Sequence, residues 1–94
     1  MKLINNMSID ALMCMYEQQD FDEMQLNEIR VGLEQGVNVS GYVNHQYHWG
    51  QMQMIRKGLE RNLDISKYAD PRVPLNDMIL MYQKLCKQKG VPAK

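Results

Sequence analysis

The chain has 94 residues and a formal net charge of zero, and 45% of its residues are hydrophobic while 23% are charged. A chain of this length can build one modest core but no deep enclosed cavity, and its apolar runs are too short to cross a membrane. We therefore expect one domain, residues 1–94, that acts through its surface. The first ten residues lack the apolar core of a secretory signal, which predicts a cytoplasmic protein.

The chain should open with a helix at residues 8–18. Ser8 is a good N-cap, and an apolar face follows at helical spacing, formed by Ile9, Leu12, Met13 and Tyr16. Residues 1–20 thus form either a leading helix or a degenerate copy of the repeat that follows.

An internal repeat with a period of 26 residues organises the rest of the chain. Residues 25–42 read QLNEIRVGLEQGVNVSGY, and residues 51–68 read QMQMIRKGLERNLDISKY. Eight of the eighteen aligned residues are identical, and most of the others are similar in size and polarity. The pattern divides the chain into a first repeat (21–46), a second repeat (47–72) and a C-terminal capping repeat (73–94).

Each copy begins with an amphipathic helix. Asp22 and Gln25 have the spacing of a capping box, so the first helix should start near residue 22. Gly36 and Asn62 tolerate the left-handed conformation that ends a helix, which places the long helices near 22–35 and 50–62. The apolar stripe is Leu26, Ile29, Leu33 and Val37 in the first copy and Met52, Ile55, Leu59 and Leu63 in the second.

A short second helix should follow each long one, because Asn38 and Asp64 are good N-caps at equivalent positions. These short helices are expected at 39–43 and 65–69. A third long helix is expected at 75–89, with Pro74 in its first turn and Lys84 in place of the recurring glycine. A terminal repeat whose outer side meets water would explain that lysine.

Gly32 and Gly58 stand in the middle of the long helices, where glycine costs about 1 kcal/mol relative to alanine. Their recurrence indicates that another helix packs too close for a side chain. Tyr42 and Tyr68 also recur, and we expect each to bury its ring between helices and to leave its hydroxyl at the surface.

Two pairs of opposite charges recur four residues apart on one flank of the long helices. Arg30 with Glu34 and Arg56 with Glu60 have the spacing of helical ion pairs. We expect each pair to form a solvated or an inter-repeat salt bridge.

Residues 44–50, NHQYHWG, form the only stretch rich in histidine and tryptophan. His45 and His48 are three residues apart, but zinc sites normally need four ligands, so we expect no metal. Trp49 is either packed at a helix start or exposed as an aromatic anchor for a partner. Cys14 and Cys86 are expected to be free and mostly buried, as in a reducing compartment.

The charges divide unevenly along the chain although they sum to zero. Residues 1–46 carry two basic and seven acidic side chains, a net charge of −5, and residues 47–94 carry nine basic and four acidic ones, a net charge of +5. Such a split suits an acidic partner, nucleic acid or head-to-tail self-association, and it can also be neutralised within the fold. The candidate partner-binding residues all lie in the second half, with Trp49 as the anchor and the steering charges Arg56, Lys57, Arg61 and Arg72.

The repeat can be written Q-[LM]-x-x-I-R-x-G-L-E-x-[GN]-[VL]-[ND]-[VI]-S-x-Y. It resembles a short helical repeat of uncharacterised proteins carried by bacterial mobile elements and prophages. In those proteins an aromatic residue stands four positions before the glutamine, as Phe21 and Tyr47 do here. The match covers residues 21–70. It implies stacked helical repeats and supplies no catalytic residue.

The sequence contains no phosphate-binding loop, nucleophile elbow, metal cluster or dinucleotide fingerprint. We therefore expect an all-α protein, a small helical-repeat bundle of about four main helices with two short intervening helices. The preferred function is a non-enzymatic protein-interaction or accessory module without a cofactor. The alternative is a nucleic-acid-binding or regulatory protein of helix-turn-helix type, because such domains also join short helices by tight turns. An overall pI near 6.7 argues against a dedicated DNA binder.

Overall fold

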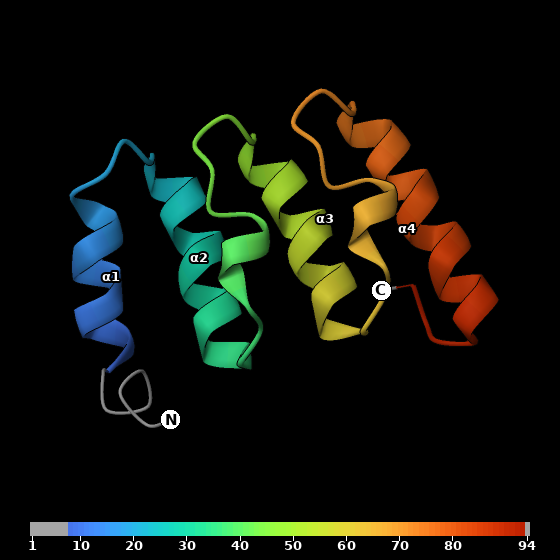
Figure 1. Cartoon of the computed structure of the whole chain (residues 1–94), viewed down its shortest axis with the longest axis horizontal. Helices are drawn as coiled ribbons and strands as arrows, with labels where there is room; N and C mark the ends of the chain where they lie inside the picture. Colours follow the sequence, from blue (N-terminus) through green and yellow to red (C-terminus); the bar gives the residue numbers. More distant parts are fainter. Residues whose placement is uncertain (1–7, 94) are drawn as a thin grey trace.

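The computed structural model describes residues 8–93, which form a row of helices (Figure 1). The long helices are α1 (Ile9–Glu17), α2 (Glu23–Gln35), α3 (Trp49–Glu60) and α4 (Leu75–Lys89), and the 3-10 helices η2 (Val39–Gly41) and η3 (Ile65–Lys67) lie between them. Within the described range the chain forms no strand, so the all-α prediction is confirmed. The long helices keep close to their expected bounds, whereas both short helices are shorter than expected. The first seven residues, on which most of the secretory-signal prediction depends, lie outside the described range.

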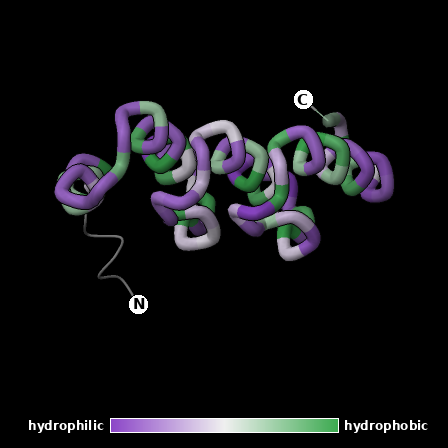
Figure 2. Tube along the Cα trace, turned by 90° about the horizontal axis from the view of Figure 1, so that it is seen from above, coloured by the Kyte–Doolittle hydropathy of each residue, from purple (hydrophilic) through white to green (hydrophobic). Residues whose placement is uncertain are grey.

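The long helices stack side by side in chain order. Figure 1 shows α2, α3 and α4 running in the same direction, while α1 runs the opposite way. The segments that contain η2 and η3 return the chain from the end of one long helix to the start of the next. Seen from above, both return segments lie on one side of the row (Figure 2). The long helices therefore keep a second side that no return segment covers.

A glutamine at the start of α2 ties this helix to the loop that leads into α3. Gln25 Oε1 accepts a hydrogen bond from the Asp22 amide, and the Asp22 carboxylate accepts one from the Gln25 amide, both at 2.8 Å, as the predicted capping box requires. Gln25 Nε2 donates to the carbonyls of His45 and Tyr47, at 3.2 and 2.7 Å. Gln51 makes the same set of bonds 26 residues further on, with His48 as its cap and Pro71 and Val73 as its carbonyl acceptors.

Both α2 and α3 are followed by a residue in the left-handed conformation, as predicted. Gly36 has a φ of 76° and Asn62 has a φ of 57°. Immediately after this turn, the amide of Val37 donates to the carbonyl of Gly32 at 3.0 Å, and the amide of Leu63 donates to that of Gly58 at 2.9 Å. The turn sends each return segment back along the helix that it has just left.

Each return segment is fastened to its long helix by a tyrosine that lies over a glycine. The Tyr42 hydroxyl donates to the Glu28 carbonyl at 2.7 Å, and the Tyr68 hydroxyl donates to the Met54 carbonyl at 2.7 Å. A Cβ atom built on Gly32 would overlap the Tyr42 hydroxyl and would lie 2.8 Å from Val39 Cγ1. We call each set of tyrosine, glycine and carbonyl a tyrosine clasp: Tyr42, Gly32 and Glu28 in the first, and Tyr68, Gly58 and Met54 in the second.

Of two expectations about these residues, one was wrong and the other is confirmed. The hydroxyls do not reach the surface, because Tyr42 is fully buried and Tyr68 is 2% exposed. A buried hydroxyl needs a hydrogen-bond partner, and a helix carbonyl with a spare lone pair supplies it. The expectation that another helix packs on each glycine is confirmed, and that helix is the short 3-10 helix of the return segment, η2 on Gly32 and η3 on Gly58. The groups that exclude a side chain are the tyrosine at the end of the short helix and Val39 in the first copy or Ile65 in the second.

Three smaller expectations also need correction. Cys86 is buried and Cys14 is exposed, and both are free thiols, so only one of the two is in the core. Arg30 pairs with Asp10 of α1 at 3.4 Å rather than with Glu34. Pro74 lies at the N-cap position of α4 and not within its first turn.

The clasp gives a test of the fold. Gly58→Ala should lower the free energy of unfolding by about 1–3 kcal/mol through overpacking, even though alanine is the better helix former by about 1 kcal/mol. Tyr68→Phe should cost about 1 kcal/mol alone and less in the Gly58→Ala background, because the new methyl group meets the hydroxyl. Urea unfolding of the wild type, the two single variants and the double variant gives the coupling free energy between the two substitutions. Gln88→Ala, on the exposed side of α4, serves as a control. If the two changes in the free energy of unfolding were strictly additive, the proposed contact between the Tyr68 hydroxyl and residue 58 would be contradicted.

Candidate interaction surface

Trp49, Gln53 and Lys57 lie along the side of α3 that the return segments leave uncovered. They are spaced four residues apart, and each is partly exposed. At about 100° per residue, Gly58 points about 180° away from Trp49. Gly58 faces Tyr68 and Ile65 of the return segment, so Trp49 faces the opposite side. Of the five residues predicted to bind a partner, two, Trp49 and Lys57, therefore lie along this uncovered side of α3.

Trp49 is the first residue of α3, and its surroundings hold it in place. His48, the N-cap, accepts a hydrogen bond from the Gly50 amide through Nδ1 at 3.0 Å. The rings of His48 and Trp49 are 5.5 Å apart and tilted by 35°. Leu75 of α4 lies close beside this turn, 3.0 Å from where a Cβ of Gly50 would be. The tryptophan is therefore both packed at a helix start and partly exposed, which were alternatives at the level of sequence.

Arg56 does not belong to the accessible surface, which corrects the prediction that it steers a partner. Its side chain is only 11% exposed and lies between α2 and α3. Arg56 Nε donates to Glu28 Oε1 at 2.9 Å, and Arg56 Nη1 donates to Glu60 Oε2 at 2.6 Å. The Arg56–Glu60 pair was predicted, and it is joined here by a buried acid from the preceding helix. Burial lowers the pKa of Arg56, but the hydrogen bonds to Glu28 and Glu60 more than offset this, so its pKa is raised.

Arg61 and Arg72 are engaged elsewhere. Arg61 Nε donates to the Pro92 carbonyl at 3.0 Å, and its guanidinium lies 5.8 Å from the centre of the Tyr82 ring. Arg72 binds both carboxylate oxygens of Asp70, at 3.1 and 2.9 Å. This contact lowers the pKa of Asp70 to about 2. Arg61 therefore fixes the C-terminal segment, and Arg72 stiffens the loop before α4.

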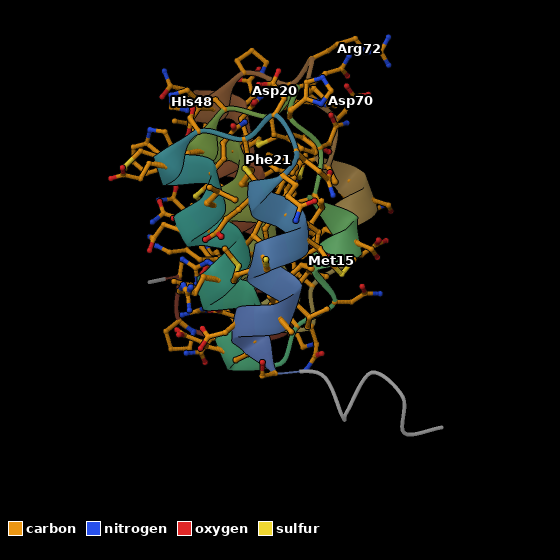
Figure 3. All side chains as sticks on the ribbon, turned by 90° about the vertical axis from the view of Figure 1, so that its left-hand side faces the viewer. Met15, Asp20, Phe21, His48, Asp70 and Arg72 are labelled. Atoms are coloured by element: carbon orange, nitrogen blue, oxygen red, sulfur yellow. The ribbon has the colours of Figure 1, made fainter. Side chains whose placement is uncertain are left out.

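The loops that precede α2, α3 and α4 gather at one end of the molecule. Figure 3 shows Asp20, His48, Asp70 and Arg72 at this end. The five residues predicted to form one partner site are thus divided among four places. Trp49 and Lys57 share the uncovered face, and Arg56 is internal. Arg61 lies at the C-terminal end of α3, and Arg72 lies in the loop before α4.

Part of the predicted charge split is neutralised inside the fold. Glu28 counts among the acids of residues 1–46 and Arg56 among the bases of residues 47–94, and they form a buried ion pair. Setting this pair aside changes the net charges from −5 and +5 to −4 and +4. Most of the charge difference between the two ends of the row therefore remains.

Glu28 is the residue that sequence reasoning missed. It is 4% exposed, although it lies outside the predicted apolar stripe. A signal existed in the repeat, since the equivalent residue of the second copy is the apolar and buried Met54. An acid in a position that is apolar in the other copy predicts a buried cation, and Arg56 is that cation.

Two shallow hollows lie between helices. One, of about 430 Å³, is between the C-terminal ends of α2 and α3, and the other, of about 350 Å³, is between α1 and α2. Their linings consist of apolar, amide, carboxylate and guanidinium groups, without histidine, cysteine or serine. Among residues 8–93, no three histidine, cysteine or acidic side chains are grouped so that they could hold a metal ion.

Comparisons of the chain with models of protein families, with curated proteins and with solved structures find no match. In the described part of the chain, no helix has both the length and the apolar character needed to cross a membrane. The resemblance of residues 21–70 to repeats of bacterial mobile elements stays a prediction that rests on the motif.

The buried ion pair gives a second test. Arg56→Met should lower the free energy of unfolding by about 3–5 kcal/mol, because it leaves Glu28 buried without a counter-charge. Adding Glu28→Met should recover most of this loss, since the second copy carries Met54 at that position. Arg72→Met, which breaks an exposed pair, serves as the control and should change stability little. A double variant no more stable than Arg56→Met would contradict this account.

Proposed function

We propose that this chain is a non-enzymatic helical-repeat protein that binds a protein partner through the uncovered side of its long helices. We call this surface the open face. The partly exposed residues assigned to it are Val31 of α2, Trp49, Gln53 and Lys57 of α3, and Leu75 and Ile79 of α4. The single observation that carries the proposal is the partly exposed stripe of Trp49, Gln53 and Lys57, which begins with Trp49 opposite Gly58.

The open face has the composition of a binding surface. Large aromatic residues supply most of the affinity of protein interfaces, and Trp49 is the only tryptophan of the chain. Aliphatic residues stand at equivalent positions on the neighbouring helices, with Leu75 at the register of Trp49 and Ile79 at that of Gln53. Lys57 supplies a charge at the rim, where charges set association rate and salt dependence more than affinity.

The helical-repeat part of the proposal is supported by contacts that recur every 26 residues. The glutamine bonds, the left-handed turn and the tyrosine clasp are each made once in residues 21–46 and once in 47–72. Stacked repeats of this kind build extended surfaces that commonly bind other proteins. The motif further supports an accessory role in a bacterial mobile element, and the two free thiols favour a cytoplasmic location.

The contacts of the basic residues favour a nucleic-acid partner less than the sequence alone does. Two of the four basic candidates are already held by other groups, Arg56 by Glu28 and Glu60 and Arg61 by the Pro92 carbonyl, whereas Arg72 pairs with Asp70 but stays 90% exposed. Phosphate binding depends on cations that are free to replace counter-ions. Binding of nucleic acid is therefore the alternative outcome of the experiment that follows.

The test uses Trp49→Ala and Lys57→Glu, with Lys67→Glu on the opposite side of the molecule as a matched charge control. We expect immobilised wild-type chain and the Lys67→Glu variant to capture the same host protein. Trp49→Ala should release it faster, and Lys57→Glu should bind it more slowly and with less dependence on salt. Equal capture by all four proteins would contradict the proposed face. A salt-sensitive shift of duplex DNA that Lys57→Glu abolishes would favour the alternative.

A further inference from the structure

We propose that the hollow between α1 and α2 receives a large apolar side chain of the protein partner, and that lysine or arginine residues beside this side chain pair with acids at the rim of the hollow. The inference rests on the proposed function, because it names the chemistry of the segment that the partner presents. It uses residues of α1 and α2, whereas the proposed anchor Trp49 belongs to α3.

The hollow between α1 and α2 has an apolar lining. Its volume is about 350 Å³, within the range of roughly 300–1,000 Å³ that is typical of ligand pockets. Met13 of α1 and Leu26 of α2 line it and are also packed into the core. Met24 of α2 lines it too, but its side chain is 48% exposed. Because methionine is unbranched and flexible, this lining can adapt to apolar side chains of different shapes.

The rim of the hollow is acidic. Glu17 at the end of α1 and Glu23 at the start of α2 line it, and both are exposed. In the described part of the chain, neither carboxylate is paired with a basic side chain. Arg30 also lines the hollow, but its guanidinium pairs with Asp10 at 3.4 Å, so these two charges offset each other. The two acids therefore leave the rim with an excess of negative charge.

The hollow lies on the same side of the row as the open face. Four of the five α2 residues that line it are within about 60° of the point opposite Gly32, at about 100° per residue. These four are Glu23, Leu26, Asn27 and Arg30. The Gly32 side of α2 is covered by its return segment, so the hollow is on the uncovered side. Glu23 stands 26 positions before Trp49 and shares its register, so a partner laid across Trp49 also reaches the hollow.

The rim charges decide which kind of segment fits the hollow. A purely apolar segment would bury surface but would leave Glu17 and Glu23 without a counter-charge, and an acidic segment would be repelled. A basic residue next to the apolar side chain satisfies both requirements. Further along the open face, Lys57 has the opposite charge, so the two signs together favour one direction of the partner across the helices.

NMR of the methionine methyl groups with a synthetic peptide tests the proposal. The probe is a short glycine–serine peptide that carries one leucine between two lysines. We expect it to shift the methyl signals of Met13 and Met24 and to leave that of Met78, which is fully buried in α4, unchanged. The shifts should weaken as salt is added, because salt screens the rim charges. Matched peptides with glutamates for the lysines, or with serine for the leucine, should produce no shift.

Charge reversal at the rim is the decisive comparison. The Glu17→Lys/Glu23→Lys protein should bind the lysine peptide about tenfold more weakly, since two exposed ion pairs are lost, and should bind the glutamate peptide instead. Glu34→Lys/Asp77→Lys makes the same change of charge at exposed positions outside the hollow and should bind as the wild type does. Circular dichroism checks that both proteins are folded. The three peptides on the wild type remain a test if the reversed protein is not.

The same titration separates this inference from the proposed open face. Trp49→Ala should bind the peptide as the wild type does, because the peptide occupies only the hollow. A peptide that shifts neither Met13 nor Met24, or that the charge-reversed protein binds as tightly as the wild type, would overturn the inference, while capture of a host protein through Trp49 would still support the open face. Shifts of Met13 and Met24 that depend on the concentration of the chain alone would assign the hollow to a second copy, and would overturn it as well.

Discussion

The bond from a tyrosine hydroxyl to a carbonyl fourteen residues earlier determines how this chain is arranged. It crosses the long helix at a glycine, because any side chain there would occupy the position of the hydroxyl. The left-handed residue after each helix aims the chain back toward that glycine, and the clasp then holds the return segment on one side. Because Tyr42 and Tyr68 are both held in this way, α2, α3 and α4 must run in the same direction. This constraint produces a row with one covered and one open side.

The same constraint positions the surfaces that we assign to function. With the return segments fixed opposite Trp49, the other side of α3 is left uncovered by them, and it is there that we propose a partner binds. At the α4 end of the row, Leu80 lies exposed on a side that no element of residues 8–93 covers. Between the helices, the glutamine and Arg56–Glu28 bonds join each unit to the next, so these polar groups lie inside the row.

Much of this fold could be predicted from one sequence because its signals are local. The capping box of Asp22, the left-handed turns at Gly36 and Asn62 and the apolar stripe each depend on neighbouring residues. Contacts between elements that are distant in the sequence were harder to predict. The pattern indicated that Gly32 and Gly58 are closely packed, but it could not say that Tyr42 and Tyr68 fill the space, because that requires the path of the return segment. The sequence could not show for a similar reason that the candidate residues lie apart: Arg56, Arg61 and Arg72 are basic, but the groups that they contact lie in other elements or loops.

The pH dependence of stability tests the clasp most directly. Burial raises the pKa of the Tyr42 and Tyr68 hydroxyls above the value of about 10 that holds in the unfolded chain. Above that pH the unfolded chain loses these two protons while the folded chain keeps them. The free energy of unfolding should then fall by about 1.4 kcal/mol per pH unit for each tyrosine. A Tyr42→Phe/Tyr68→Phe variant lacks both groups, so its stability should fall less steeply by about twice that amount. Equal slopes for the two proteins above pH 10 would contradict the buried clasps.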